Sequence, residues 1–204
     1  MINKIEQIFS SVASPKAFAE GYLDHLKSVL DGLDTGSIAS FIEVLKDARD
    51  AGKRIFFIGN GGSAATASHF ANDLSVGTRA WDKPYRAVAL TDNVAILTAL
   101  GNDHGYDDIF LLQLKTQAVA GDLLVAISAS GNSPNILKAV TYANNEGIIS
   151  IGLTGFDGGA LKKLSKLAVH VPTGKGEYGP VEDVHMIFDH LVAGYLMLDC
   201  RKNA

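Results

Sequence analysis

The sequence contains almost no cysteine, and this scarcity limits both the cross-links and the compartment that we expect. Cys200 is the only cysteine among 204 residues, so no disulfide can form within the chain and nothing indicates an oxidising compartment. The first residues also lack the basic region and apolar run of a signal peptide, and no stretch approaches about 18 consecutive apolar residues. We therefore expect a cytoplasmic protein with no membrane partner.

An excess of positive charge is missing as well. The chain has 18 lysine and arginine residues against 22 aspartate and glutamate residues, for a formal net charge of -4. Proteins that bind a nucleic-acid backbone normally cluster lysine and arginine on one surface, so nucleic acid is not an expected partner. The 47% hydrophobic content is sufficient for a full core, and the length favours one compact unit.

Short apolar runs of strand-forming residues alternate with helical patterns along most of the chain. The first run, RIFFI at 54–58, is apolar at every position after Arg54, as a strand buried on both faces is. Four further strands are expected at 86–90, 123–127, 148–153 and 167–171, and helices at 63–76, 106–120, 134–146 and 181–199. This alternation requires parallel strands joined by right-handed crossovers. The fold class that we predict is α/β, with three layers and a five-stranded parallel sheet flanked by helices.

Two additional helical patterns, at 15–31 and 37–50, precede the first strand. The sheet does not need them to cover its faces. We expect residues 1–52 to form N-terminal helices that pack on the core and take part in oligomerisation, and residues 53–204 to form the α/β domain, within one compact unit.

Two glycine- and serine-rich loops follow expected strands. Gly59-Asn60-Gly61-Gly62-Ser63 leads directly into a helix, where free backbone N–H groups attract an anion, although a plain turn with Ser63 as N-cap explains it too. The second loop is Ser128-Ala129-Ser130-Gly131-Asn132-Ser133, and Pro134 begins the next helix. Both loops occupy the position at which open α/β sheets bind ligands. We predict that phosphate binds at the second loop.

A dinucleotide site is not expected at the first loop. The fingerprint requires a third glycine where Ala64 stands and an acid near the end of the second strand, which here ends Ala89-Leu90-Thr91. We therefore expect no nucleotide cofactor.

Five segments, taken in order, resemble the successive motifs of phosphoheptose isomerases, a family of SIS (sugar isomerase) domain proteins. They are FIGNGGSAATASHFANDL, LTALGNDHGYDDIF, AISASGNSPNILKA, GLTGFDGG and VEDVHMIFDHL, and they extend from about residue 53 to about residue 198. The resemblance implies conversion of sedoheptulose 7-phosphate to D-glycero-D-manno-heptose 7-phosphate through an enediolate, for heptose biosynthesis. It also implies a homotetramer, and leaves open that one site draws residues from different subunits.

Ionisable residues on two helices are candidates for the chemistry. His69 and Asp73 stand at i and i+4 and share one side of a helix, as an ordinary surface pair also does. Glu182 and His190 are eight residues apart, which separates them by roughly 80° and about 12 Å on a regular helix. To share an ion with His190, Glu182 would have to stand at or just before the first turn of its helix.

The resemblance assigns roles to these and other residues. It implies Asp73 as catalytic base and His190 as partner acid and base, and a divalent metal, zinc by family precedent, held by His69, Asp73, Glu182 and His190. The substrate-binding positions that it implies are Asn60, Gly61, Gly62, Ser63, Asp92, Ser128, Ser130, Ser133 and Glu182.

The chain departs from the family pattern at several of these places. Asp73 replaces a longer glutamate, Glu182 replaces glutamine, Ala129 replaces threonine, and Gly179-Pro180 replaces a polar pair. His185 and Asp189 form a competing i, i+4 pair, and spacing alone does not decide between His185 and His190.

These departures keep three alternatives open. The first is an isomerase of another sugar phosphate, the second is a non-catalytic SIS regulator that resembles replication-initiator-binding proteins, and the third is a sugar-phosphate sensor.

Overall fold

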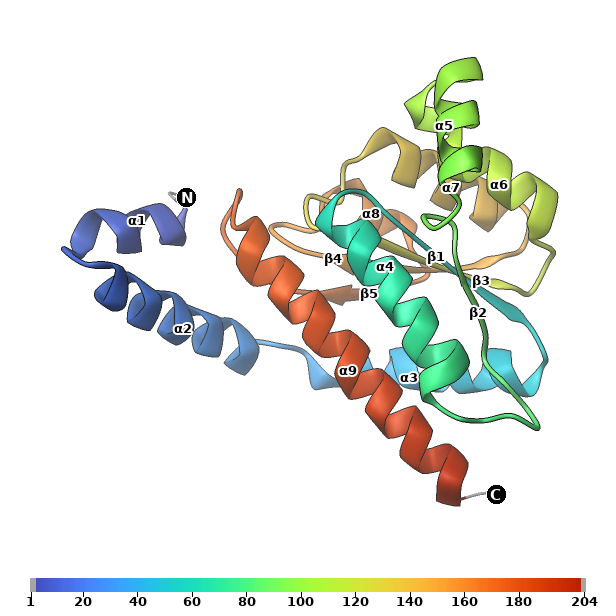
Figure 1. The fold of residues 1–204 in the computed structure, drawn as a ribbon, viewed down its shortest axis with the longest axis horizontal. Helices are drawn as coiled ribbons and strands as arrows, with labels where there is room; N and C mark the ends of the chain where they lie inside the picture. The colour runs from blue at the N-terminus through green and yellow to red at the C-terminus, as the bar shows by residue number, and fades with distance from the viewer. Residues whose placement is uncertain (1–2, 203–204) are drawn as a thin grey trace.

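The computed structural model describes residues 3–202, which form a single five-stranded parallel sheet with helices on both sides (Figure 1). The strand order is β2-β1-β3-β4-β5. The strands are β1 Arg54–Gly59, β2 Arg86–Ala89, β3 Leu123–Ser128, β4 Ile149–Thr154 and β5 Leu167–His170. All four pairings are parallel, so the predicted fold class and all five predicted strands are confirmed.

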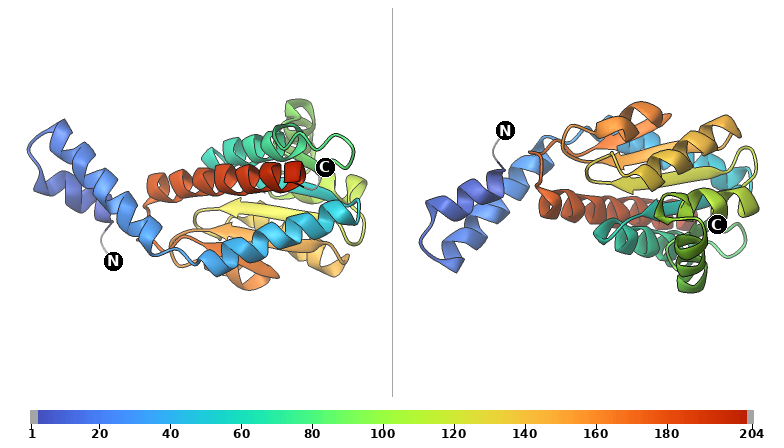
Figure 2. Two further views of the ribbon diagram at one scale, coloured as in Figure 1. Left: turned by 90° about the horizontal axis from the view of Figure 1, so that it is seen from below. Right: turned by 90° about the horizontal axis from the view of Figure 1, so that it is seen from above.

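Alternate residues of the buried strands pack into two hydrophobic clusters, one on each face of the sheet. On β1, Phe57 joins one cluster and Phe56 the other. Three helices cover the first face: α3 Thr35–Asp50, α4 Gly62–Asn72 and α9 Tyr178–Lys202. Three others cover the second face: α6 Ile109–Gln117, α7 Pro134–Asn145 and α8 Gly159–Leu164. The result is a three-layer arrangement, which Figure 2 shows from its two opposite helix-covered sides.

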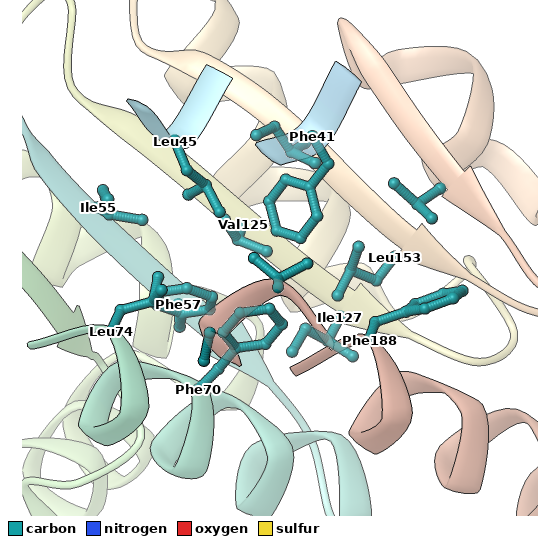
Figure 3. Close-up of a cluster of buried hydrophobic side chains, with 14 of the residues drawn as sticks. Phe41, Leu45, Ile55, Phe57, Phe70, Leu74, Val125, Ile127, Leu153 and Phe188 are labelled. Carbon is teal, nitrogen blue, oxygen red and sulfur yellow. The ribbon is translucent and has the colours of Figure 1, made fainter. Parts of the chain in front are cut away.

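Aromatic rings lock α4 onto the sheet. Phe70 stacks on Phe57 of β1 with ring centroids 5.0 Å apart, and meets Phe41 of α3 edge to face at 5.8 Å (Figure 3). All three side chains are fully buried. This packing fixes the face of α4 that carries His69 with respect to the sheet.

Several helices differ from their predicted extents. The predicted helix 63–76 ends as α4 at Asn72 and continues as a π-helical turn, η1 Asp73–Gly77. The predicted helix 106–120 opens with a 3-10 turn, η2 Tyr106–Asp108, before α6. The helices α1 Lys4–Ser11, α5 Val94–Asp103 and α8 were not predicted.

The N-terminal helices divide into two parts. The third, α3, packs on the sheet, whereas α1 and α2 Pro15–Asp31 form a hairpin that projects from the body (Figures 1 and 2). Glu177 ties this hairpin down, because its carboxylate accepts a hydrogen bond from the Lys4 N–H and pairs with His25 Nε2, each at 2.8 Å. Burial opposes ionisation of Glu177, yet these bonds keep its pKa below the ordinary value.

No helix within residues 3–202 combines the length and apolar character needed to cross a membrane.

Candidate functional site

The two predicted loops meet at the carboxyl edge of the sheet, because β1 and β3 are neighbours. Reciprocal amide bonds of 2.9 Å join Asn60 in the first loop to Asn135 at the start of α7. The Tyr106 hydroxyl donates a further bond of 2.9 Å to Asn60 Oδ1. The loops are therefore held together by side chains from three segments, and Asn60 is their common partner.

A cavity of about 140 Å³ lies between the loops. Its lining residues are Asn60, Ser63, Ile127, Ser128, Ala129, Ser130, Ser133, Tyr178 and Glu182. Ser133 is the N-cap of α7, yet its side chain makes no capping bond within the chain, which leaves the hydroxyl for a ligand. The cavity therefore offers hydroxyls and the amino end of a helix to an anion.

The start of α4 differs from the simple-turn interpretation. Its N-cap is Gly61, in the left-handed region at a φ of +55°, and no side chain caps it. Ser63 is buried inside the first turn and lines the cavity. The interpretation of Ser63 as N-cap is therefore wrong.

Glu182 lies at this cavity. A Cβ added to Gly62 would stand only 2.5 Å from Glu182 Oε2, so the carboxylate occupies the space that the missing side chain leaves. The helix α9 begins at Tyr178, which puts Glu182 inside the helix rather than at or before its first turn, as an ion shared with His190 would have required. Burial, with a smaller contribution from Asp183, raises the pKa of Glu182.

A second group of side chains lies further along α4 and α9, which pack side by side (Figure 1). It consists of His69, Asp73, Asp189 and His190, each of which offers one donor atom within 4.8 Å of the others. His69 Nε2 is 3.5 Å from Asp73 Oδ2 and 3.9 Å from Asp189 Oδ2, and the two imidazole centroids are 5.2 Å apart. All four residues belong to one chain.

Asp189 is the buried member of this group. Its side chain has no exposed surface, and neither carboxylate oxygen has a hydrogen-bond partner among the described residues. Burial, followed by the neighbouring Asp73 carboxylate, raises the pKa of Asp189 to about 7. Its environment therefore penalises the charged form unless a cation compensates it.

Three of the four expected metal ligands come together, and Asp189 stands with them in place of Glu182. Two imidazoles and two carboxylates supply the nitrogen and oxygen donors that zinc and similar divalent metals accept, and the unpartnered Asp189 fits such an ion. The residues present therefore suit a divalent metal, while its identity stays a prediction.

Two other residues lie elsewhere. Asp92 accepts hydrogen bonds from Ser68 and Thr91 and faces a separate cavity of about 710 Å³ beside α4. His185 is fully buried against β4, where its Nε2 is 3.4 Å from the Thr154 carbonyl oxygen, and burial lowers its pKa to about 4. Of the two competing histidines, His190 is the one beside His69.

Four residues that contribute to the site were not predicted from the sequence. Tyr178 lines the serine cavity, Tyr106 and Asn135 hold Asn60, and Asp189 was weighed only as a partner of His185. The sequence did contain one signal for Asp189, because it is an acidic residue among the apolar positions of α9.

Comparisons with known proteins agree with this geometry. The SIS domain model matches residues 21–155. Phosphoheptose isomerase of Geobacter sulfurreducens is 40% identical over 169 residues, covering 80% of this chain and 89% of that protein, and phosphoheptose isomerase 2 of Campylobacter jejuni is 40% identical over 152 residues, covering 74% of each. The structure of phosphoheptose isomerase from Neisseria gonorrhoeae superposes with a TM-score of 0.81 at 29% identity, covering 90% of this chain and 98% of that one. The sequence identity, the shared fold and the paired loops together establish that this chain belongs to the phosphoheptose isomerase family of SIS-domain proteins.

Proposed function

We propose that this chain is an aldose-ketose isomerase that converts sedoheptulose 7-phosphate to D-glycero-D-manno-heptose 7-phosphate for heptose biosynthesis in the cytoplasm. The observation that carries the proposal is the pairing of an anion-binding cavity with a cluster of two imidazoles and two carboxylates on the same two helices. The relatives named phosphoheptose isomerase support the choice of substrate.

The separation of the two groups suits a substrate with its phosphate and its carbonyl at opposite ends. Gly62 and Glu182 face each other at the cavity, and His69 and His190 face each other further along. The seven residues from Gly62 to His69 correspond to roughly 10 Å along α4. A sugar phosphate that lies along these helices brings its reactive carbons to the histidines when its phosphate occupies the cavity.

The phosphate contacts come from neutral groups. Ser128, Ser130 and Ser133 supply hydroxyls, and the amino end of α7 supplies backbone N–H groups. Asn60, Gly61, Gly62 and Ser63 form the opposite wall. Glu182, whose raised pKa eases protonation, accepts or donates a hydrogen bond to a sugar hydroxyl at this wall. Asp92 is assigned to the sugar hydroxyls by resemblance alone.

The proton transfers belong to Asp73 and His190. Isomerisation requires a base that moves a proton between adjacent carbons and a donor that stabilises the enediolate oxygens. Asp73 opens the π-helical turn that follows α4, a distortion often found at functional sites. A divalent metal, which we propose to be zinc, supplies a Lewis acid for the carbonyl when bound there.

We further propose a homotetramer. Apolar side chains are exposed on two surfaces of the single chain: Phe9 and Leu23 on the N-terminal hairpin, and Leu191, Tyr195 and Leu198 on α9. Exposed apolar surface of this kind marks protein interfaces.

Incubation with sedoheptulose 7-phosphate and zinc, followed by an assay for the aldose, tests the activity. A variant that lacks the Ser130 and Ser133 hydroxyls should show a raised KM, whereas Ser40→Ala on the exposed side of α3 serves as the control. Binding of the sugar phosphate without turnover would favour the non-catalytic regulator instead, and turnover of a different sugar phosphate alone would correct the substrate.

A further inference from the structure

We propose that Asp189 is a direct ligand of the divalent metal and takes the place that the resemblance gives to Glu182. The ligand set is then His69, Asp73, Asp189 and His190. The proposal rests on the proposed function for the presence of a metal, but the assignment of Asp189 comes from this chain alone.

The geometry of the group supports this assignment. The four donor atoms lie within 4.8 Å of one another, with Asp189 Oδ2 3.9 Å from His69 Nε2. Donor atoms this close to one another are within reach of a single ion. Both helices belong to the core, so the group is held by the same packing that builds the sheet layer.

The burial of Asp189 supplies the second argument. Its neighbours on the inner side of α9, Phe188 and Val192, are buried apolar residues, so Asp189 is an acidic residue at a core position of this helix. A fully buried carboxylate without a hydrogen-bond donor is costly, and Asp73 adds a second negative charge. One divalent cation between the carboxylates removes both penalties, whereas His69, at 3.9 Å from Asp189 Oδ2, makes no hydrogen bond to it and offsets at most one negative charge when protonated.

Glu182 is placed for a different task. Its carboxylate lies against Gly62, and the seven helical steps from Gly62 to His69 correspond to roughly 10 Å along α4. Glu182 therefore lines the serine cavity, and the metal cluster of the described chain does not include it.

Zinc affinity measured by competition with a chromophoric chelator separates the two carboxylates. Asp189→Asn should weaken zinc binding at least tenfold, as loss of a ligand or of its support does, whereas Glu182→Ala, which leaves no ligand atom at 182, should change it less than about twofold. Circular dichroism checks that each variant is folded. Equal affinity of Asp189→Asn and wild type, or a loss in Glu182→Ala as large as that in Asp189→Asn, overturns the assignment.

A second measurement does not depend on how the asparagine variant folds. Asp189→Cys, loaded with Co²⁺, should show the near-ultraviolet charge-transfer absorption of a thiolate bound to cobalt, because thiolates are good ligands for such ions. Glu182→Cys is the matched control, and the buried Cys200 is common to both proteins. A spectrum without this band in Asp189→Cys, or with it in Glu182→Cys, contradicts direct ligation by Asp189.

Neither measurement uses isomerase activity. A protein that binds zinc through Asp189 but leaves sedoheptulose 7-phosphate unchanged would refute the proposed function and keep this inference. An active isomerase whose zinc affinity is unchanged by substitution of Asp189 would keep the proposed function and refute this inference.

Discussion

Replacement of Gly131 by alanine tests how the serine loop is held. Gly131 has a φ of +64°, and an added Cβ would lie 2.1 Å from the Gly158 carbonyl oxygen. Gly52 has nearly the same φ, +66°, but nothing lies within 4 Å of an added Cβ. Both substitutions therefore carry the penalty of a left-handed alanine, about 1 kcal/mol, and only Gly131→Ala adds a backbone clash.

The clash must move the loop away from the start of α8. Two hydrogen bonds cross this contact, from the Leu161 N–H to the Gly131 oxygen at 2.9 Å and from the Ala160 N–H to Asn132 Oδ1 at 3.1 Å. Their loss adds about 1 kcal/mol each, so we expect Gly131→Ala to lower the free energy of unfolding by about 3 kcal/mol and Gly52→Ala by about 1 kcal/mol.

Urea unfolding of the two variants and wild type measures this difference, provided that the denaturant slopes agree. Because Ser130 and Ser133 flank the displaced residue, Gly131→Ala should also raise KM for the sugar phosphate, and Gly52→Ala should not. Equal stability losses in the two variants would refute the argument that close backbone approach, rather than φ alone, requires glycine at 131.

Three further predictions follow from other contacts. Glu177→Gln should lower the free energy of unfolding by about 2 kcal/mol and speed hydrogen exchange in the α1–α2 hairpin, and an unchanged exchange pattern would contradict the role of Glu177 in holding the hairpin. Because the folded pKa of Glu177 is depressed, wild type should lose this stabilisation as pH falls through that pKa. The folded pKa of His185 is about 4, so as pH falls from 6.5 to 4 the unfolded chain takes up a proton that the folded protein resists, and the free energy of unfolding of wild type should fall by up to about 3 kcal/mol. Unfolding curves of His185→Leu should lack this pH-dependent loss. Mixtures of His190→Ala and Asp73→Ala subunits, after subunit exchange, should regain no activity, because both residues of the cluster lie in one chain, and recovered activity would show that subunits share it.

The strands were predictable because their physical signal is local. A parallel strand buried on both faces reads as a continuous apolar run, and RIFFI at 54–58 differs from β1 by one residue. The missed helices lack such a signal. In α5 apolar residues do not gather on one face and none is buried, while α1 and α8 are short. Nor does an i, i+4 pattern reveal that the helix with His69 changes to a π-helical turn at Asp73.

The site was predictable where the motif and the sheet order determine it. The two loops follow neighbouring strands, so their meeting follows from topology. Helical spacing correctly separates Glu182 from His190, but the start of α9 three residues before the predicted start, at Tyr178, puts Glu182 beside Gly62. Which carboxylate joins the histidines depends on how α4 packs against α9, and no local pattern encodes that packing.

The most direct test of the proposed isomerisation is the reaction of the zinc-loaded protein with sedoheptulose 7-phosphate in D₂O, followed by proton NMR. A proton carried by a side-chain base exchanges with solvent, so we expect the aldose product to carry deuterium on the carbon that receives the proton, and we expect neither product nor deuterium incorporation with Asp73→Asn. Tight binding of the sugar phosphate with neither aldose nor deuterium incorporation would contradict it.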